Sequence, residues 1–265
     1  MMRHSAFARG VVLVGGVVLL SAGRAGAQQP VVAPAPDTPQ FMSRTDFHMN
    51  AAKLTIDDAR FVWDTHFGGG LDVFDYVAGR LNVLIDYEAV LGRQIRAFDP
   101  NQGNYALEGS LSKRFGGTEV AAVFGHLSRH LGDRAKTIPV DWNDLGLRAL
   151  RRERVGTATV DVVAGLARMT KHDNLDYIWK GDVDVLVRRP VNGRAALFGH
   201  GRTEFYGVDS ARGTQAGGLF EAGVHLSGRA GAVELFAGVE RRVDADPLEL
   251  QPQSWGFAGF RLLSR

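Results

Sequence analysis

Beyond residue 40, apolar and polar side chains alternate at every second position along most of the chain. The segment 81–90, LNVLIDYEAV, has an apolar residue at each odd position, with Asn82, Asp86 and Glu88 on the opposite face. Segments 105–115, 178–187 and 194–205 repeat this pattern, whereas helical periodicity is almost absent. Alternation with a period of two is typical of β-strands, whose side chains point to opposite faces in turn. The sequence therefore predicts an all-β protein.

The two faces of these strands differ in a way that indicates where the protein resides. One face is apolar with side chains of modest size, and the other carries full charges, as at Asp182 and Asp184. Strands that are apolar outside and polar inside are typical of transmembrane β-barrels, in which lipid covers the outer wall. A long soluble barrel is the alternative.

The connections between strands alternate in length, as expected of an outer-membrane barrel with short periplasmic turns and longer external loops. The predicted short connections are 76–79, 116–117, 154–156, 190–193 and 228–231, and the long ones are 92–103, 131–141, 170–176, 208–214 and 242–253. A downward strand near 59–75 needs an upward strand before it, and segment 43–55 fills that place. The prediction is a twelve-stranded antiparallel transmembrane β-barrel of the outer-membrane type with both termini in the periplasm.

Aromatic side chains gather at the predicted upper ends of the strands. On this topology the outward residues there include Trp63, Tyr87, Tyr105, Tyr177, Trp179 and Phe205. Such rings prefer the interface between lipid and water, so they are expected to form a girdle.

The N-terminal residues predict export. Residues 1–27 combine Arg3 and Arg9, an apolar run and a small-residue cleavage site before Gln28, which is the pattern of a signal peptide. The Pro-rich segment 28–40 is interpreted as an extended periplasmic linker, and 41–265 as the barrel. The expected location is the bacterial outer membrane.

Charge and cysteine content exclude several classes of function. The chain has 31 Lys and Arg against 29 Asp and Glu. Loss of Arg3, Arg9 and Arg24 with the signal peptide leaves 28 against 29. The sequence shows no basic patch of the kind that would predict binding to nucleic acid. The chain has no cysteine, which excludes disulfides, thiolate metal sites and a cysteine nucleophile. The residues alone indicate no cofactor.

The stretch FGHLSRHLGDR, residues 124–134, holds the candidate chemistry. His126, Ser128 and His130 alternate along one predicted strand, so their side chains share one face. A serine nucleophile needs a base within hydrogen-bonding reach and a third group that orients the base. Polar residues at a wet rim are the alternative interpretation.

The face that these residues occupy depends on the preceding turn. A two-residue loop at Gly116 and Gly117 sets His126 opposite Leu107, on the lipid side. A three-residue loop sets His126 opposite Glu108, inside the lumen. The sequence leaves both registers open.

The stretch HLSRHLGDR resembles an H-x-S-x-H-L-G-D segment of an uncharacterised family of bacterial outer-membrane proteins. The wider segment 125–150 is also distantly similar to the outer-membrane phospholipase A family, a twelve-stranded barrel with an H-x-S motif followed by a W-N pair. Arg129 and His130 stand where that family has Asn-Gly, and the segment before Trp142 is longer here.

The resemblance implies a set of roles. It makes His126 the base, Ser128 the nucleophile and Asn143 the residue that orients His126, all on the lipid-facing surface. It also implies assistance by Ca²⁺ and a homodimer. Asn143 has the strand parity of Leu145 and Leu147, so it is expected to face lipid, with the His126 imidazole within reach of the Ser128 hydroxyl.

Two functions follow from these observations. The first is an ester hydrolase that acts on phospholipid or lipid A at the outer leaflet through His126, Ser128 and Asn143. The second is a non-enzymatic barrel, either a small channel or a structural outer-membrane protein with a charged lumen. In that reading, lumen residues such as Asp182, His200 and Glu204 form a solvated or ion-paired interior. An outward-facing site favours the first.

Overall fold

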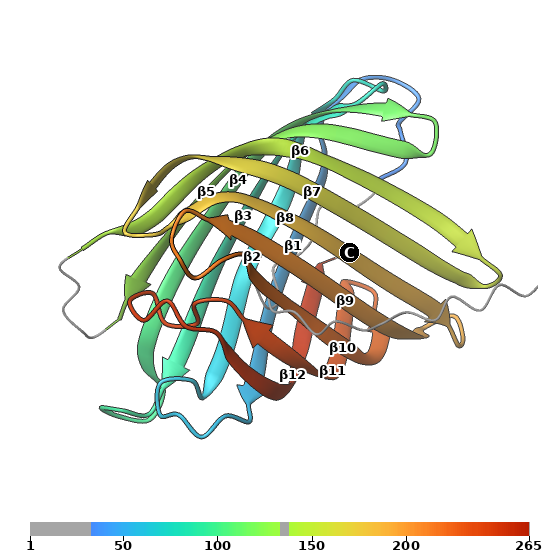
Figure 1. The fold of residues 1–265 in the computed structure, drawn as a ribbon. Helices are drawn as coiled ribbons and strands as arrows, with labels where there is room; N and C mark the ends of the chain where they lie inside the picture. Colours follow the sequence, from blue (N-terminus) through green and yellow to red (C-terminus); the bar gives the residue numbers. More distant parts are fainter. Residues whose placement is uncertain (1–32, 133–137, 265) are drawn as a thin grey trace, which may run out of the picture.

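The computed structural model describes residues 33–132 and 138–264, which form one closed antiparallel barrel of twelve strands (Figure 1). The strands are β1 Gln40–Leu54, β2 Trp63–Asp75, β3 Arg80–Gly92, β4 Asp99–Phe115, β5 Thr118–Leu131, β6 Val140–Val155, β7 Ala158–Asp173, β8 Tyr177–Pro190, β9 Ala195–Val208, β10 Gln215–Ser227, β11 Gly231–Arg242 and β12 Gln253–Ser264. Each strand pairs with its neighbours in sequence, and β1 pairs with β12 to close the wall. The described residues contain no helix that is long and apolar enough to cross a membrane.

The predicted fold is confirmed, including the strand expected at 43–55, which is β1. Because the strand number is even, the start of β1 and the end of β12 lie at the same end of the barrel. The backbone N–H of Phe47 donates a hydrogen bond to the Ser264 hydroxyl at 2.6 Å there. The predicted signal peptide, 1–27, and the first part of the predicted linker lie outside the described residues.

The two ends of the barrel carry different connections. The turn-bearing end holds 76–79, 116–117, 156–157, 191–194 and 228–230. The loop-bearing end holds 55–62, 93–98, 174–176, 209–214 and 243–252, together with 132 and 138–139 at the ends of β5 and β6. Two of the predicted long connections are wrong in length. β7 runs on to Asp173 and leaves only 174–176 of the predicted 170–176, and β4 begins at Asp99 and leaves only 93–98 of the predicted 92–103.

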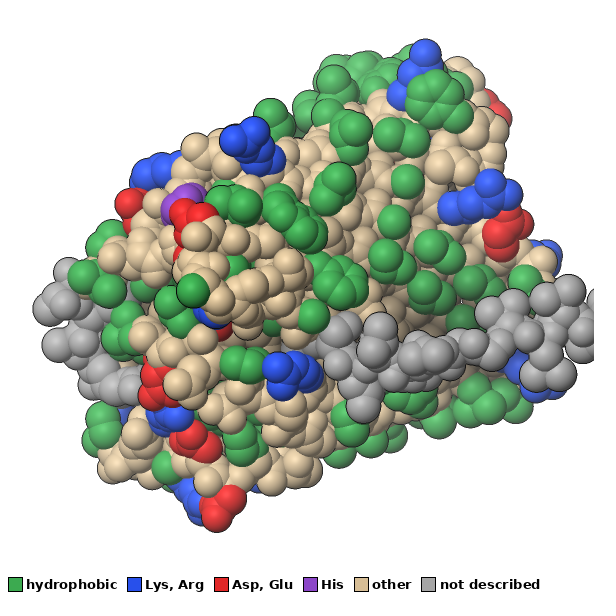
Figure 2. All heavy atoms as spheres, viewed as in Figure 1, with side chains coloured by type: hydrophobic (Ala, Val, Ile, Leu, Met, Phe, Trp, Pro, Cys, Tyr) green, Lys and Arg blue, Asp and Glu red, His purple; other side chains and the backbone are tan. Residues whose placement is uncertain are grey.

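The outer wall is apolar along most of its height. Exposed side chains on it include Ile85, Leu111, Leu145, Leu147, Leu166, Val183, Leu197, Phe220 and Leu235. Figure 2 shows hydrophobic side chains spread over the barrel wall, with charged side chains concentrated toward its two ends. This distribution matches a bilayer, with hydrocarbon around the wall and water at both ends.

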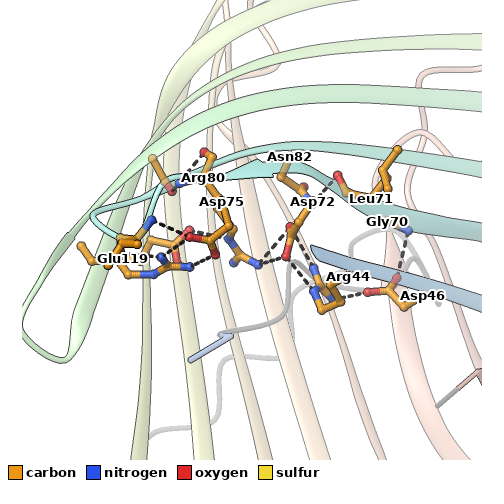
Figure 3. A network of polar contacts seen from close by, with 12 residues as sticks. Arg44, Asp46, Gly70, Leu71, Asp72, Asp75, Arg80, Asn82 and Glu119 are labelled. Carbon is orange, nitrogen blue, oxygen red and sulfur yellow. Dashed lines mark hydrogen bonds and ion pairs between the residues drawn. The ribbon is translucent and has the colours of Figure 1, made fainter. Parts of the chain in front are cut away.

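Buried ion pairs fill the lumen. Near the turn-bearing end, the buried guanidinium of Arg80 lies 3.0 Å from Asp72 and 2.8 Å from Glu119, and Arg44 contacts Asp72 from β1 at 2.9 Å (Figure 3). Elsewhere in the lumen, the guanidinium of Arg261 lies 2.9 Å from Glu221 and 2.7 Å from Glu234 and so bridges the two carboxylates. Buried charges need partners of opposite sign, and the inward positions of neighbouring strands supply them here.

One predicted member of the aromatic girdle points the other way. Tyr177 is only 2% exposed and its hydroxyl donates a hydrogen bond to Asp244 inside the barrel mouth. The pairing of β8 with β9 shifts register between Tyr177 and Trp179, which reverses the face of Tyr177 relative to the rest of the strand. Alternation read from the sequence does not reveal such a bulge.

A charge on the outer wall tests the assignment of faces. Val183 is 43% exposed and lies near the middle of β8. Val183→Arg should destabilise the protein in bilayers by about 2–4 kcal/mol, because the guanidinium would face hydrocarbon near the midplane. Urea titration of the protein folded in phospholipid vesicles, followed by tryptophan fluorescence, measures this cost. Val191→Arg, in the turn 191–194, is the matched control and should change stability little; equal costs would mean the wall is assigned wrongly.

Candidate functional site

The turn before β5 fixes the face of the candidate residues. Phe115 pairs with Thr118 across the two-residue loop, and Gly116 has the positive φ, 59°, that such a tight turn requires. His126 therefore pairs with Leu107, and the register that would set it opposite Glu108 is not the one adopted. His126, Ser128 and His130 lie on the outer wall.

The surroundings agree with this assignment. Phe124 precedes His126 on the same face, and Leu107 lies beside it on β4; both are 47% exposed on the apolar wall. Arg129, between Ser128 and His130, points into the lumen and is buried. The same strand therefore presents candidate chemistry outward and a lumen cation inward.

His126 and Asn143 form a hydrogen bond between neighbouring strands. They are paired residues of β5 and β6, and Nδ1 of His126 donates to Oδ1 of Asn143 at 2.6 Å. A proton held on Nδ1 leaves the lone pair of Nε2 free to act as a base. The predicted neighbourhood of Asn143 and His126 is present in the structure.

Ser128 has a different partner from the predicted one. Among the described residues, its hydroxyl is hydrogen-bonded to Nε2 of His130 at 2.9 Å, whereas the ring of His126 is hydrogen-bonded across the sheet to Asn143. His126 and His130 flank Ser128 at equal sequence distances on one strand face, so the sequence could not say which of them holds the hydroxyl. An imidazole thus lies on each side of Ser128 along this face.

A cluster of aromatic rings sets the level of this site in the wall. Tyr105 pairs with Ser128 across β4 and β5, and its ring lies edge-on to His130 at 5.5 Å. The Tyr105 ring contacts Tyr87 at 4.7 Å, and Tyr87 contacts Phe67 at 5.1 Å. Aromatic belts mark the interface between hydrocarbon and water. Ser128 therefore lies at the interfacial level near the loop-bearing end.

Among the described residues, those around Ser128 do not form a calcium cage. Asp141 pairs with Ser128 from β6, and Asp173 pairs with Asp141 from β7. The ammonium of Lys171 lies 2.8 Å from Asp173 and 3.7 Å from Asp141, so a protein cation already neutralises these carboxylates. Ca²⁺ takes six to eight oxygen ligands. These side chains do not fit the ion that the resemblance implies.

The loop 243–252 folds into the loop-bearing mouth of the barrel. Asp244 and Ala245 are fully buried, and Arg129 donates to their carbonyl oxygens at 2.7 and 3.0 Å. Arg212 holds the Asp244 carboxylate through bonds of 2.7 and 2.8 Å. The sequence analysis missed this insertion, which places Asp244 and Ala245 inside the mouth of the barrel.

A second H-L-S tripeptide, also missed, occurs at 225–227. His225 and Ser227 face the lumen at the turn-bearing end of β10, with Nε2 of His225 3.2 Å from the Ser227 hydroxyl. Nδ1 of His225 lies 3.0 Å from Glu234, which Arg261 also holds. The tripeptide alone therefore does not single out the outer-wall site, and its position in the barrel has to be considered too.

No known family model matches the sequence, and no curated protein matches it. Among solved structures, outer membrane phospholipase A from Escherichia coli is similar with a TM-score of 0.51 and 13% identity, over 82% of this chain and 89% of that one. The calcium-bound dimer of the Salmonella typhi phospholipase has a TM-score of 0.51 and 13% identity, over 82% and 90%. LpxR from Salmonella typhimurium has a TM-score of 0.48 and 9% identity, over 83% and 99%. At these identities the likeness shows the fold alone, which is that of outer-membrane barrels.

The attachment of loop 243–252 gives a prediction for acid pH. Burial alone would raise the pKa of Asp176, but hydrogen bonds from Arg212 and Ser210 outweigh it and hold the pKa below its usual value. Because the pKa of Asp176 is lower in the folded protein than the ordinary value of about 3.9, its ionised carboxylate stabilises the fold above pH 3.9. This contribution is lost as the pH falls through the pKa of the folded state. Backbone amides of 243–252 should therefore stay protected from hydrogen exchange down to about pH 4.

Protection should fall below that pH after correction for intrinsic exchange rates. Arg212→Gln is the comparison variant, because it removes the cation that joins Asp176 to Asp244 and should expose the loop at every pH. Equal protection in the variant and the original protein at neutral pH would contradict the assigned role of Arg212.

Proposed function

We propose that this protein is an ester hydrolase of the bacterial outer membrane that acts on acyl lipids of the outer leaflet. Ser128 is the nucleophile, His126 the general base and Asn143 the residue that orients His126. The observation that carries the proposal is the outward-facing hydrogen bond between His126 and Asn143 beside Ser128, at the level of the aromatic rings. The ester groups of membrane lipids lie at this interfacial level.

The first half of the reaction forms an acyl-enzyme. The side-chain oxygen of Asn143 accepts a hydrogen bond from Nδ1–H of His126. The proton therefore stays on Nδ1, and the lone pair of Nε2 remains available. Nε2 takes the proton of the Ser128 hydroxyl as its oxygen attacks the ester carbonyl carbon. The tetrahedral intermediate collapses when Nε2 delivers that proton to the departing alcohol oxygen, which leaves the acyl group on Ser128.

The second half releases the fatty acid. Water enters from the loop-bearing end, loses a proton to Nε2 of His126 and attacks the acyl carbonyl carbon. Collapse of the second intermediate returns the proton to the Ser128 oxygen and frees the carboxylic acid. The steps of this scheme use protein groups alone, and Lys171 pairs with the neighbouring carboxylates Asp173 and Asp141.

His130 is the resting partner of the nucleophile in this scheme. Rotation of the Ser128 side chain about its Cα–Cβ bond moves the hydroxyl from His130 toward His126. The edge-on contact of His130 with Tyr105 holds the resting partner in place. A lipid bound over Tyr105 would displace this arrangement as it enters.

The candidate substrates are phospholipid and lipid A, since both present ester-linked acyl chains at this depth. The channel alternative is disfavoured by the buried loop 243–252 and by the ion pairs across the lumen. A homodimer across the wall around Leu107 and Leu145 is a proposal that rests on the resemblance, and both residues are exposed there.

Removal of the nucleophile should abolish activity without unfolding the barrel. Ser128→Ala should lower kcat/KM for ester hydrolysis of phospholipid in mixed micelles by at least about a thousandfold. The matched control is Ser227→Ala in the second H-L-S tripeptide, which should retain full activity. Loss of activity in Ser227→Ala with full activity in Ser128→Ala would move the reaction to the opposite end of the barrel. Full activity in both variants would exclude both serines as the nucleophile, and no activity in the original protein would favour the structural alternative.

The two histidines beside Ser128 should differ in effect. His126→Ala should lower kcat by about 10²–10⁴-fold, the usual contribution of a general base. His130→Ala removes only the residue that holds the Ser128 hydroxyl in the resting state. It should therefore change kcat by less than about tenfold. Steady-state kinetics on the two variants, with heat-dependent gel mobility as the check on folding, distinguish them. The reverse order of effects would make His130 the base.

A further inference from the structure

Three ligand-type side chains meet in the lumen toward the loop-bearing end, away from the outer-wall site. Asp64 and His66 belong to β2, and His66 pairs with Glu88 of β3 across the hairpin. Asp64 lies two residues from His66, so all three side chains share the inward face. Their exposed fractions are 1%, 2% and 7%.

The donor atoms of these side chains have the spacing of a metal site. Nε2 of His66 lies 3.3 Å from Oδ1 of Asp64 and 3.7 Å from Oε1 of Glu88. The donor atoms all lie within 4.8 Å of one another. A tetrahedral ion with bonds of about 2.0–2.2 Å holds its ligand atoms roughly 3.3–3.6 Å apart. The side chains are therefore already spaced for one cation.

Two of these donor atoms have no hydrogen-bond partner among the described residues. Oδ1 of Asp64 and Nε2 of His66 are both buried, and each faces the other across 3.3 Å. This contact is an ion pair that does not meet the geometry of a hydrogen bond, whereas almost all buried polar atoms in proteins are hydrogen-bonded. A cation between them satisfies both.

The far side of the imidazole is oriented as in histidine metal ligands. Nδ1 of His66 donates to Oδ2 of Asp86 at 2.8 Å, which directs the Nε2 lone pair toward Asp64 and Glu88. Carboxylates that accept from the second ring nitrogen are a regular feature of metal-binding histidines. The other oxygen of Asp86 is hydrogen-bonded to His48 at 2.9 Å, so Asp86 is itself held in place.

The charge balance around the cluster favours a further cation. Arg242 lies 2.5 Å from Asp64, 2.7 Å from Glu88 and 2.9 Å from Glu240. Three carboxylates thus contact one guanidinium, and Asp86 adds a fourth carboxylate beside His66. A divalent ion offsets most of the remaining negative charge in this buried environment. A small cavity lined by Asp64, His66 and Glu240 adjoins the cluster and gives room for a water ligand.

We propose that Asp64, His66 and Glu88 bind one divalent first-row transition-metal ion of the Zn²⁺ or Mn²⁺ type. One imidazole and two carboxylates suit these ions, whereas Ca²⁺ prefers an all-oxygen shell. The ion ties β2 to β3 inside the barrel mouth. This metal site is separate from the proposed ester hydrolysis, and neither proposal depends on the other.

Metal binding to the full chain in detergent tests the proposal. After treatment with EDTA and dialysis against Zn²⁺, elemental analysis should find one equivalent of zinc per chain. Co²⁺ in place of Zn²⁺ should give visible absorption bands of a low-coordinate site. His66→Gln should weaken binding by at least about tenfold, since it removes the only nitrogen ligand.

His200→Gln is the matched control. His200 also lies between two carboxylates in the lumen, but both of its ring nitrogens are hydrogen-bonded, to Asp184 at 2.8 Å and Glu221 at 3.2 Å. This variant should bind zinc as the original protein does. Heat-dependent gel mobility shows whether each variant has folded, and the zinc content of the original protein decides the proposal even if His66→Gln does not fold.

Three results would overturn the proposal. Absence of stoichiometric zinc and manganese in the original protein would leave His66 as an imidazolium between Asp64 and Asp86. Equal affinity in folded His66→Gln would place the ion elsewhere. Preference for Ca²⁺ over Zn²⁺ would exclude a nitrogen ligand.

Discussion

Twelve strands can cross a bilayer only if every backbone N–H and C=O finds a partner within the protein, because hydrocarbon offers no water to bind them. The pairing of β1 with β12 meets this requirement by removing both free edges of the sheet. Closure then divides each strand into a face toward lipid and a face toward the lumen. The apolar wall, the ion-paired interior and the outward position of Ser128 all follow from that division.

Much of this division can be read from the sequence. The alternation of apolar and polar residues predicts most of the strands. The alternation of short and long connections then requires one more upward strand at the start, which is the weakly patterned strand β1. The Gly116–Gly117 turn sets the register of β4 and β5, but the sequence alone allowed either loop length, and the choice decides whether His126 meets lipid or the lumen. Local sequence therefore restricts the site to two faces, and the pairing in three dimensions selects one.

Other features depend on contacts between residues far apart in the chain. The bulge that turns Tyr177 inward arises between β8 and β9. The Tyr177 hydroxyl then donates a hydrogen bond to Asp244 of loop 243–252. The inserted loop is held by Arg129 from the opposite side of the barrel, and nothing in the segment 243–252 itself marks it as buried. Ser128 is hydrogen-bonded to His130, whereas the His126 ring is hydrogen-bonded across the sheet to Asn143.

The lumen ion pairs also bear on how such a barrel is assembled. Arg242 of β11 meets Asp64 of β2 and Glu88 of β3, so these two carboxylates gain this partner only when the first and last hairpins come together. A half-built sheet would carry these charges unpaired, and hydrocarbon does not tolerate them. Insertion and closure are thereby coupled: the charges that make the open sheet unfit for the bilayer become, once paired, the interior of the finished wall.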